Sequence, residues 1–98
     1  MAFEFSKDRM TRRNEHGDLM GYITFPQVKK NLVNIDHVFT DPAFRGQGNA
    51  AVMMEALLCH LEEQGKKALL TCPYAQSYVA EHPQWTKLLP NDIKFEKN

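Results

Sequence analysis

The stretch from Asp41 to Ala50 constrains this chain more than any other segment. It reads Asp-Pro-Ala-Phe-Arg-Gly-Gln-Gly-Asn-Ala, follows an apolar strand-like run and opens a segment with helical periodicity. Gly46 and Gly48 permit positive φ and carry no side chain that would block an approaching anion. A helix N-terminus offers unpaired N–H groups and the positive end of the helix dipole, and Arg45 adds charge. The segment therefore predicts a phosphate-binding turn between a strand and a helix.

Two common phosphate-binding motifs do not fit this turn. A P-loop needs Gly-Lys-Ser or Gly-Lys-Thr, and neither follows Gly48. A dinucleotide-binding fingerprint would place its first glycine where Phe44 or Arg45 stands, and the chain before that point has no room for a strand–helix–strand unit. Both classes of nucleotide site are disfavoured.

The bulk composition narrows the classes of partner. Twelve basic and twelve acidic residues cancel, so no net field attracts nucleic acid or an anionic membrane, and neither is an expected partner. The length suits a single domain over residues 1–98, and the oligomeric state leaves no signal in the sequence. No apolar run is long enough for a signal peptide or a membrane span, so a cytoplasmic protein is expected.

The two cysteines, Cys59 and Cys72, fall in different predicted elements and form no Cys-x-x-Cys pair. A metal site is therefore not expected. A disulfide between them is disfavoured in a reducing compartment.

Hydrophobic periodicity predicts an α+β fold. Residues 3–10, 19–28 and 32–40 have strand character and are separated by polar turns, which makes a three-stranded antiparallel meander. Residues 48–64 have helical periodicity and end at Gly65, a typical C-cap. Polar residues, including Asn49, Glu55, Glu62 and Glu63, lie away from an apolar stripe of Ala50, Ala51, Met54, Leu57, Leu58 and Leu61.

The remaining sequence predicts one further crossover. Residues 67–72 form a short apolar strand, which a right-handed crossover through the helix would place parallel to the third strand. Residues 74–81 form a short helix that stops at His82, because the residue before Pro83 avoids the helical region. Trp85 and Leu88-Leu89 are expected to fold back over the core.

Four motifs in register over about half the chain resemble the GNAT superfamily of acyl-CoA N-acyltransferases, and in particular its small YjdJ-like subgroup. They are His37 ahead of the strand exit Thr40-Asp41-Pro42, the loop Arg45-Gly46-Gln47-Gly48-Asn49-Ala50, Cys72-Pro73-Tyr74, and His82-Pro83-Gln84-Trp85. The resemblance implies a minimal GNAT fold over roughly residues 3–90. It lacks the helical pair after the first strand and the extra C-terminal strands of full-length members.

The resemblance also implies an activity and a cofactor site. The chain would transfer an acetyl group from acetyl-CoA to a primary amine without a metal, holding the CoA pyrophosphate on the Arg45–Ala50 loop. The pantetheine would lie in a gap bordered by Val38, Phe39 and Thr40 on one side and residues 70–72 on the other. Without the helical pair, the acceptor site would be an open groove able to admit an extended amine such as a protein lysine. The alternative is a CoA-binding or protein-interaction module without turnover.

Two residues beside this gap are the catalytic candidates. Strand alternation groups His37 with Val33, Ile35 and Phe39, which is compatible with a buried histidine that serves only the core. Its position beside the implied gap favours a base, since an imidazole has an ordinary pKa of about 6.5. Cys72 has three interpretations: a small core residue, a contact for the acyl group, or a nucleophile.

Tyr78 lies where many family members place a tyrosine that protonates the departing thiolate, so the resemblance adds it to the CoA site. A tyrosine on an amphipathic helix is also a common core or rim residue.

Overall fold

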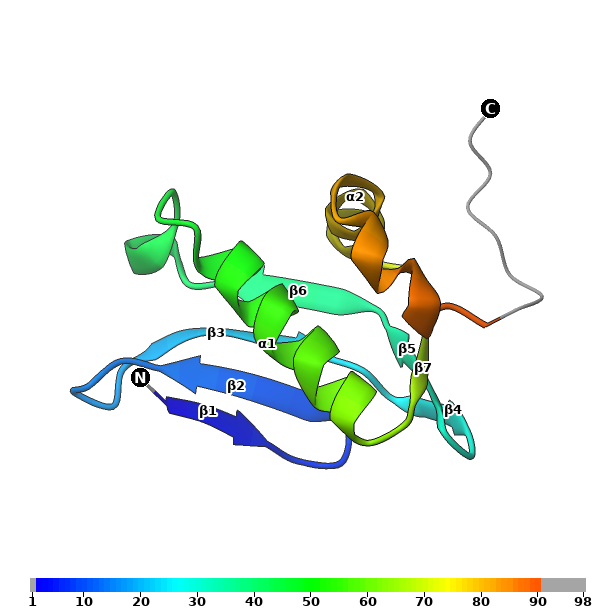
Figure 1. The fold of residues 1–98 in the computed structure, drawn as a ribbon. Helices are drawn as coiled ribbons and strands as arrows, with labels where there is room; N and C mark the ends of the chain where they lie inside the picture. Colours follow the sequence, from blue (N-terminus) through cyan, green and yellow to red (C-terminus); the bar gives the residue numbers. More distant parts are fainter. Residues whose placement is uncertain (1, 91–98) are drawn as a thin grey trace.

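The computed structural model of the chain describes residues 2–90. Its elements follow the predicted order of strands, helix, strand and short helix (Figure 1). The strands are β1 (Ala2–Phe5), β2 (Arg9–Arg13), β3 (Leu19–Thr24), β4 (Gln27–Lys29), β5 (Leu32–Ile35), β6 (His37–Thr40) and β7 (Lys67–Leu70). The helices are α1 (Asn49–Glu63) and α2 (Pro73–Glu81), with the 3-10 helices η1 (Pro42–Phe44) and η2 (Pro83–Leu88).

The strands form two sheets, and only Asp36 separates β5 of one sheet from β6 of the other. Sheet A has the order β1-β2-β3-β6 and is antiparallel throughout. Sheet B has the order β4-β5-β7, and β7 runs parallel to β5 as the crossover through α1 predicts. The α+β fold class is confirmed, and so is the parallel strand.

Each of the three predicted strands is broken in the structure, so those boundaries were wrong. The first turns at Ser6, whose N–H donates to the Arg9 carbonyl at 2.8 Å and closes a β1–β2 hairpin. The second breaks at Pro26, which has no N–H to give to a ladder. The third breaks at Asp36, where the chain leaves sheet B and enters sheet A.

Helix α1 covers one face of sheet A and supplies much of the core (Figure 1). Leu57, Leu58 and Leu61 are buried as predicted, together with Met54 and the unpredicted Met53. Gly21 lets β6 and the helix approach β3, because a Cβ at this position would collide with the Phe39 carbonyl oxygen and would lie 2.8 Å from the Met53 Cε. The remaining core side chains come from both sheets, α2 and η2: Met10, Ile23, Phe25, Val33, Ile35, Ala68, Cys72, Ala75, Tyr78, Val79, Trp85 and Leu88.

The prediction that Asn49 lies on the polar side of α1 was wrong, because this side chain is only 3% exposed. Its Nδ2 donates to the Met20 carbonyl at 2.9 Å, and its Oδ1 accepts from the Arg12 guanidinium at 2.6 Å. A buried amide is tolerated when it is hydrogen-bonded in this way. The pair fixes the first turn of α1 to β2 and to the start of β3.

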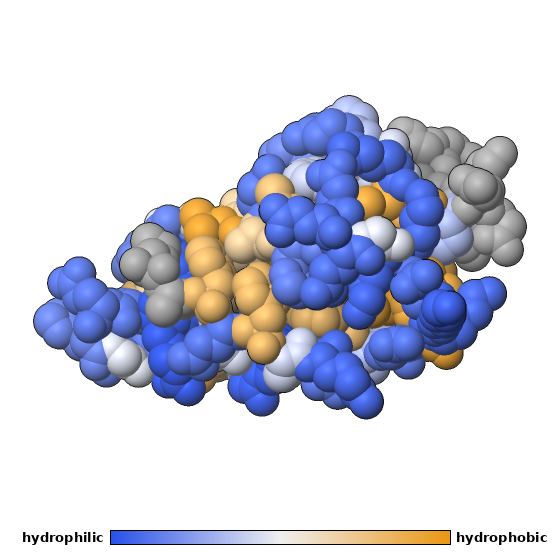
Figure 2. Space-filling view, turned by 60° about the horizontal axis from the view of Figure 1, so that its bottom comes forward, coloured by the Kyte–Doolittle hydropathy of each residue, from blue (hydrophilic) through white to orange (hydrophobic). Residues whose placement is uncertain are grey.

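Apolar surface is exposed on the side of the molecule that carries β1 (Figure 2). Phe5 of β1 is 39% exposed and stacks on the His60 ring of α1, with 3.9 Å between ring centroids. Val52 of α1 is 41% exposed. Burial against the protein lowers the pKa of His60, which favours the neutral imidazole for this stacking.

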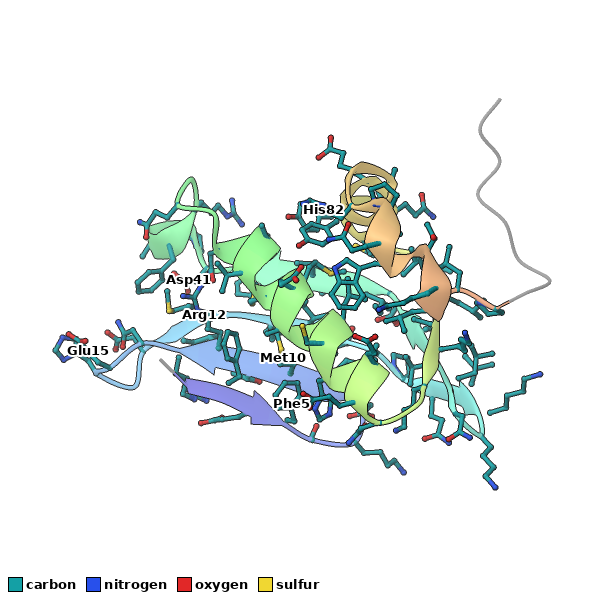
Figure 3. All side chains as sticks on the ribbon, in the orientation of Figure 1. Phe5, Met10, Arg12, Glu15, Asp41 and His82 are labelled. Atoms are coloured by element: carbon teal, nitrogen blue, oxygen red, sulfur yellow. The ribbon has the colours of Figure 1, made fainter. Side chains whose placement is uncertain are left out.

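One carboxylate joins α1, α2 and η2. The Glu55 Oε1 accepts from the Tyr78 hydroxyl at 2.6 Å and from the Trp85 indole N–H at 3.1 Å. The hydrogen bond from Tyr78 lowers the pKa of Glu55. Tyr78 also stacks on His82, with 4.0 Å between ring centroids (His82 is labelled in Figure 3). Trp85 and Leu88 are buried, so the predicted fold-back over the core is confirmed.

We expect Tyr78→Phe to lower the free energy of unfolding by about 1 kcal/mol at neutral pH, since it removes a hydrogen bond to a charged acceptor that solvent can partly replace. The folded-state pKa of Glu55 is depressed. The contribution of this bond is therefore present above the unfolded-state pKa and is lost as the pH falls through the folded-state pKa. Urea denaturation should show the two proteins converging in acid.

The matched control is Tyr74→Phe, because the Tyr74 side chain is 36% exposed and makes no hydrogen bond within residues 2–90. Its midpoint should stay at the native value at both pH values. Equal midpoints for Tyr78→Phe and the native protein at neutral pH would contradict the stabilising role of the Glu55 contact.

Candidate functional site

The loop before α1 has the conformation that an anion site needs. Asp41 caps η1 by accepting from the Ala43 N–H at 3.0 Å. Gly46 and Gly48 both take left-handed backbone conformations, with φ of 76° and 75°. Gly48 is the N-cap of α1 and has no side chain to satisfy the first N–H groups of the helix. Those donors, and the positive end of the helix dipole, therefore face outward from the loop.

A pocket of about 310 Å³ lies against this loop. A Cβ built on Gly46 or on Gly48 would meet no atom within 4 Å, so the space beside both residues is open. Arg45 is exposed, and its Nε donates to the Thr40 carbonyl at 3.1 Å, which holds the guanidinium at the rim. The pocket is lined by Thr40, Phe44, Arg45, Gly46, Gly48, Asn49, Ala50, Ala51 and Tyr74.

The loop residues contribute to this pocket unequally. The Asn49 side chain is turned inward to Arg12 and Met20, so only its backbone faces the pocket; Figure 3 labels Arg12 near the same end of α1. Ala50 lines the pocket with a methyl group only, which leaves room for a ligand. Gln47 is exposed and does not line the pocket.

The outer edge of β6 is the second part of the site. Asp41 donates its N–H to the Met20 carbonyl at 2.9 Å, so by strand alternation the Phe39 backbone also faces β3. The backbone groups of Val38 and Thr40 then point the other way, toward the side of β7. Pairing between β5 and β7 ends at Ile35 and Leu70, so β6 has no partner on that edge within residues 2–90.

His37 lies at the start of β6 and is exposed. The prediction that it shares a face with Val33 and Ile35 was wrong, because the break at Asp36 changes the alternation. His37 instead lies on the face of sheet A opposite α1, with 6.0 Å between its ring centroid and that of Tyr22. No hydrogen bond joins it to Cys72 among the residues that the structure describes.

Cys72 is a free thiol, 6% exposed, at the N-cap of α2. Its N–H and that of Thr71 both donate to the Ile35 carbonyl, at 3.1 and 3.2 Å. This places Cys72 at the point where the two sheets separate. Cys59 is also free and is exposed; burial and the neighbouring Glu55 raise the pKa of its thiol, which favours the unreactive form.

Tyr78 and Tyr74 differ in their relation to the pocket. The Tyr78 hydroxyl donates to Glu55, and burial, reinforced by this hydrogen bond, raises the pKa of Tyr78 far above its ordinary value. Tyr74 lines the pocket, and burial raises its pKa as well. The sequence places Tyr74 in the Cys72-Pro73-Tyr74 motif but predicts no role for it in the site, because its contact with the loop depends on how α2 packs rather than on a local pattern.

A second pocket, of about 420 Å³, lies at the far end of sheet B and is lined by Lys29, Lys30, Asn31, Leu32, Lys67, Leu69 and Pro90. It is larger than the pocket at the loop, but no helix N-terminus opens into it. Within residues 2–90, no group of three His, Cys, Asp or Glu side chains is arranged to hold a metal ion. No helix in this part of the chain is long and apolar enough to cross a membrane.

Comparison with known proteins identifies the family. Residues 4–88 match the model of the GCN5-related N-acetyl-transferase family. Protein NATD1 from Gallus gallus is 38% identical over 61 residues, which cover 62% of this chain and 56% of NATD1. The chain thus matches little more than half the length of this curated relative.

Solved structures share the fold. The solution structure of a GCN5-like putative N-acetyltransferase from Staphylococcus aureus has a TM-score of 0.73 at 19% identity, covering 97% of this chain and 90% of that chain. Rv2747 from Mycobacterium tuberculosis, in complex with CoA and NLQ, has a TM-score of 0.63 at 18% identity, covering 79% and 48%. With 85 consecutive residues (4 through 88) inside the family model, this chain belongs to the GCN5-related N-acetyl-transferase family.

Proposed function

We propose that this chain transfers an acetyl group from acetyl-CoA to a primary amine, with the CoA pyrophosphate held by the Arg45–Ala50 loop. The observation that carries the proposal is the pocket at this loop, where two left-handed glycines expose the N-terminus of α1. Family membership supports the reaction class. The CoA complex of Rv2747, which shares the fold, supports the ligand.

The residues of the pocket fit a pyrophosphate group. Open space beside Gly46 and Gly48 allows phosphate oxygens to approach backbone donors closely. Arg45 adds a cation at the rim, where it already contacts the Thr40 carbonyl. The unpaired edge of β6 offers the backbone of Val38 and Thr40 to pantetheine amides, and Phe39 lies between them in the strand. Bound acetyl-CoA would supply the reactive thioester.

The remaining candidate residues act on the amine, on the acetyl group or on the position of α2. His37 accepts the proton that an incoming ammonium must lose before its nitrogen can attack a thioester carbonyl. Cys72 borders the acetyl group at the point where the sheets separate. Tyr74 lines the pocket, while Tyr78 positions α2 through Glu55. The ammonium first gives one proton to His37. The amine nitrogen then gains the acetyl group as the thioester C–S bond breaks, and its second proton goes to the departing sulfur, so that CoA leaves as the free thiol.

A second candidate function is CoA binding without turnover. It is favoured by the exposure of His37 and by the absence of a hydrogen bond between His37 and Cys72 within residues 2–90. The two functions differ in one measurement. Acyl transfer releases free CoA thiol when an amine is added, whereas a binding module gives a calorimetric signal with CoA and no thiol release.

We expect Gly48→Asn to weaken CoA binding by more than about tenfold in calorimetric titration, because its side chain would occupy the place of a phosphate. Asparagine is chosen because it tolerates the left-handed conformation better than other side chains. The matched control is Gly65→Asn, at the opposite end of α1, where φ is also positive at 70°. Native affinity in a folded Gly48→Asn protein would remove the loop from the site.

A base at position 37 should be visible in the pH dependence of kcat/KM. His37→Gln should remove the part of the rise in kcat/KM with pH that a base at this position provides, while CoA affinity stays within a few-fold of native. His16→Gln is the control, since His16 is exposed in the β2–β3 turn. An unchanged profile in His37→Gln would exclude the histidine as the base.

Direct attack by the amine predicts that Cys72→Ala keeps measurable turnover, reduced by about tenfold through altered packing. A nucleophilic Cys72 would instead gain one acetyl group from acetyl-CoA alone, releasing CoA thiol. Intact-protein mass spectrometry distinguishes the two, with Cys59→Ala as the control for a merely exposed thiol. A label on Cys72 that passes to added amine as fast as turnover would contradict direct attack.

A further inference from the structure

The face of sheet A opposite α1 carries a row of aromatic side chains. Ile23 and Val38 are paired in register and pack into the core beneath α1. Because neighbouring strand residues point to opposite faces, Tyr22 and Phe39 lie on the other face, together with His37. Tyr22 and Phe39 are half-buried and stack with 5.0 Å between ring centroids. Helix α1 crosses the sheet on the side shown in front in Figure 1, so it leaves this face open.

A cation lies at the β2 end of this row. The Arg9 guanidinium is stacked over the Tyr22 ring, with its Cζ 3.9 Å from the ring centroid. Stacking uses the flat face of the guanidinium and leaves its N–H groups free along the edges. Arg13, which alternation places on the same face, is instead paired with Glu4 at 3.4 Å. No ion pair within residues 2–90 involves Arg9.

A carboxylate and an imidazole lie at the β6 end. Thr24 is paired in register with His37, and its hydroxyl donates to the Asp36 carboxylate at 2.5 Å. Asp36 and His37 are both exposed, at the break that separates the two sheets. The row therefore has a negative group beside the unpaired edge of β6, an apolar surface in the middle, and a positive group on β2.

We propose that this face is the acceptor site and that its substrate is an aromatic amine carrying a carboxylate. The ammonium approaches Asp36 and His37, the ring lies on Phe39, and the carboxylate binds the edge of Arg9. A carboxylate matches the site better than a phosphate dianion does, because Arg9 is a single cation. This inference rests on the proposed acetyl transfer, since it makes the amine at this face the acetyl acceptor.

The test compares two probes that differ only in the anion, 4-(aminomethyl)benzoate and benzylamine. In the native protein we expect kcat/KM with acetyl-CoA to favour the benzoate by at least about tenfold. Arg9→Gln should bring the ratio of the two kcat/KM values close to one, because only the benzoate loses a partner for its carboxylate. Arg13→Gln is the matched control and should keep the preference, because the Arg13 charge is already paired with Glu4.

A binding measurement separates this inference from the proposed function. In NMR titrations without acetyl-CoA, 4-(aminomethyl)benzoate should shift the resonances of Tyr22, Phe39 and His37, and Arg9→Gln should weaken its affinity by about tenfold. Such binding without thiol release from any amine would support the site and contradict the acetyl transfer. Equal kcat/KM for the two probes would contradict the acceptor site but not the acetyl transfer. The same conclusion would follow if Arg9→Gln and Arg13→Gln reduced the preference for the benzoate equally.

Discussion

The backbone carbonyl of Ile35 accepts hydrogen bonds from the consecutive N–H groups of Thr71 and Cys72, and the remainder of the site depends on this contact. One residue later, the Asp36 N–H donates to the Thr24 carbonyl of sheet A. The chain thus leaves one sheet for the other within two residues. Since β7 turns into α2 at the same point, the next strand, β6, keeps one edge without a partner strand within residues 2–90, and its backbone groups there can accept other hydrogen bonds.

The second constraint is the attachment of α1 at its N-terminus. The Asn49 side chain, held between Arg12 and the Met20 carbonyl, is the only buried amide side chain within residues 2–90. Apolar packing holds the rest of the helix against the sheet but does not fix the position of its first turn. The hydrogen bonds of Asn49 fix that position, and they place the loop of Gly46 and Gly48 beside Thr40 at the end of β6. The exposed N–H groups at the start of α1 and the end of β6 thereby lie beside one pocket.

Local signals in the sequence were sufficient to predict the fold class, both helices and the parallel strand. Gly65 and Pro83 mark helix ends, and the apolar periodicity identifies each element, from residues that are close together in the sequence. The strand breaks were not predictable in the same way: Asp36 changes sheets because of where β3 and β7 lie. A one-residue irregularity reverses every side chain after it, which is why His37 was assigned to the wrong face. Tyr22 and Arg9 belong to no local motif, and Tyr74 belongs to one that says nothing of the loop; the positions of all three relative to the site follow only from packing across elements.

The central claim is that the loop before α1 and the open edge of β6 form a single CoA surface. It is tested most directly by following backbone amide resonances of the isotope-labelled protein during titration with CoA. The account predicts shifts concentrated at Val38, Thr40, residues 45–51 and Tyr74, with little change at Lys29, Lys30 and Lys67. Saturation of shifts around those lysines, or a loop that does not respond to CoA, would contradict it.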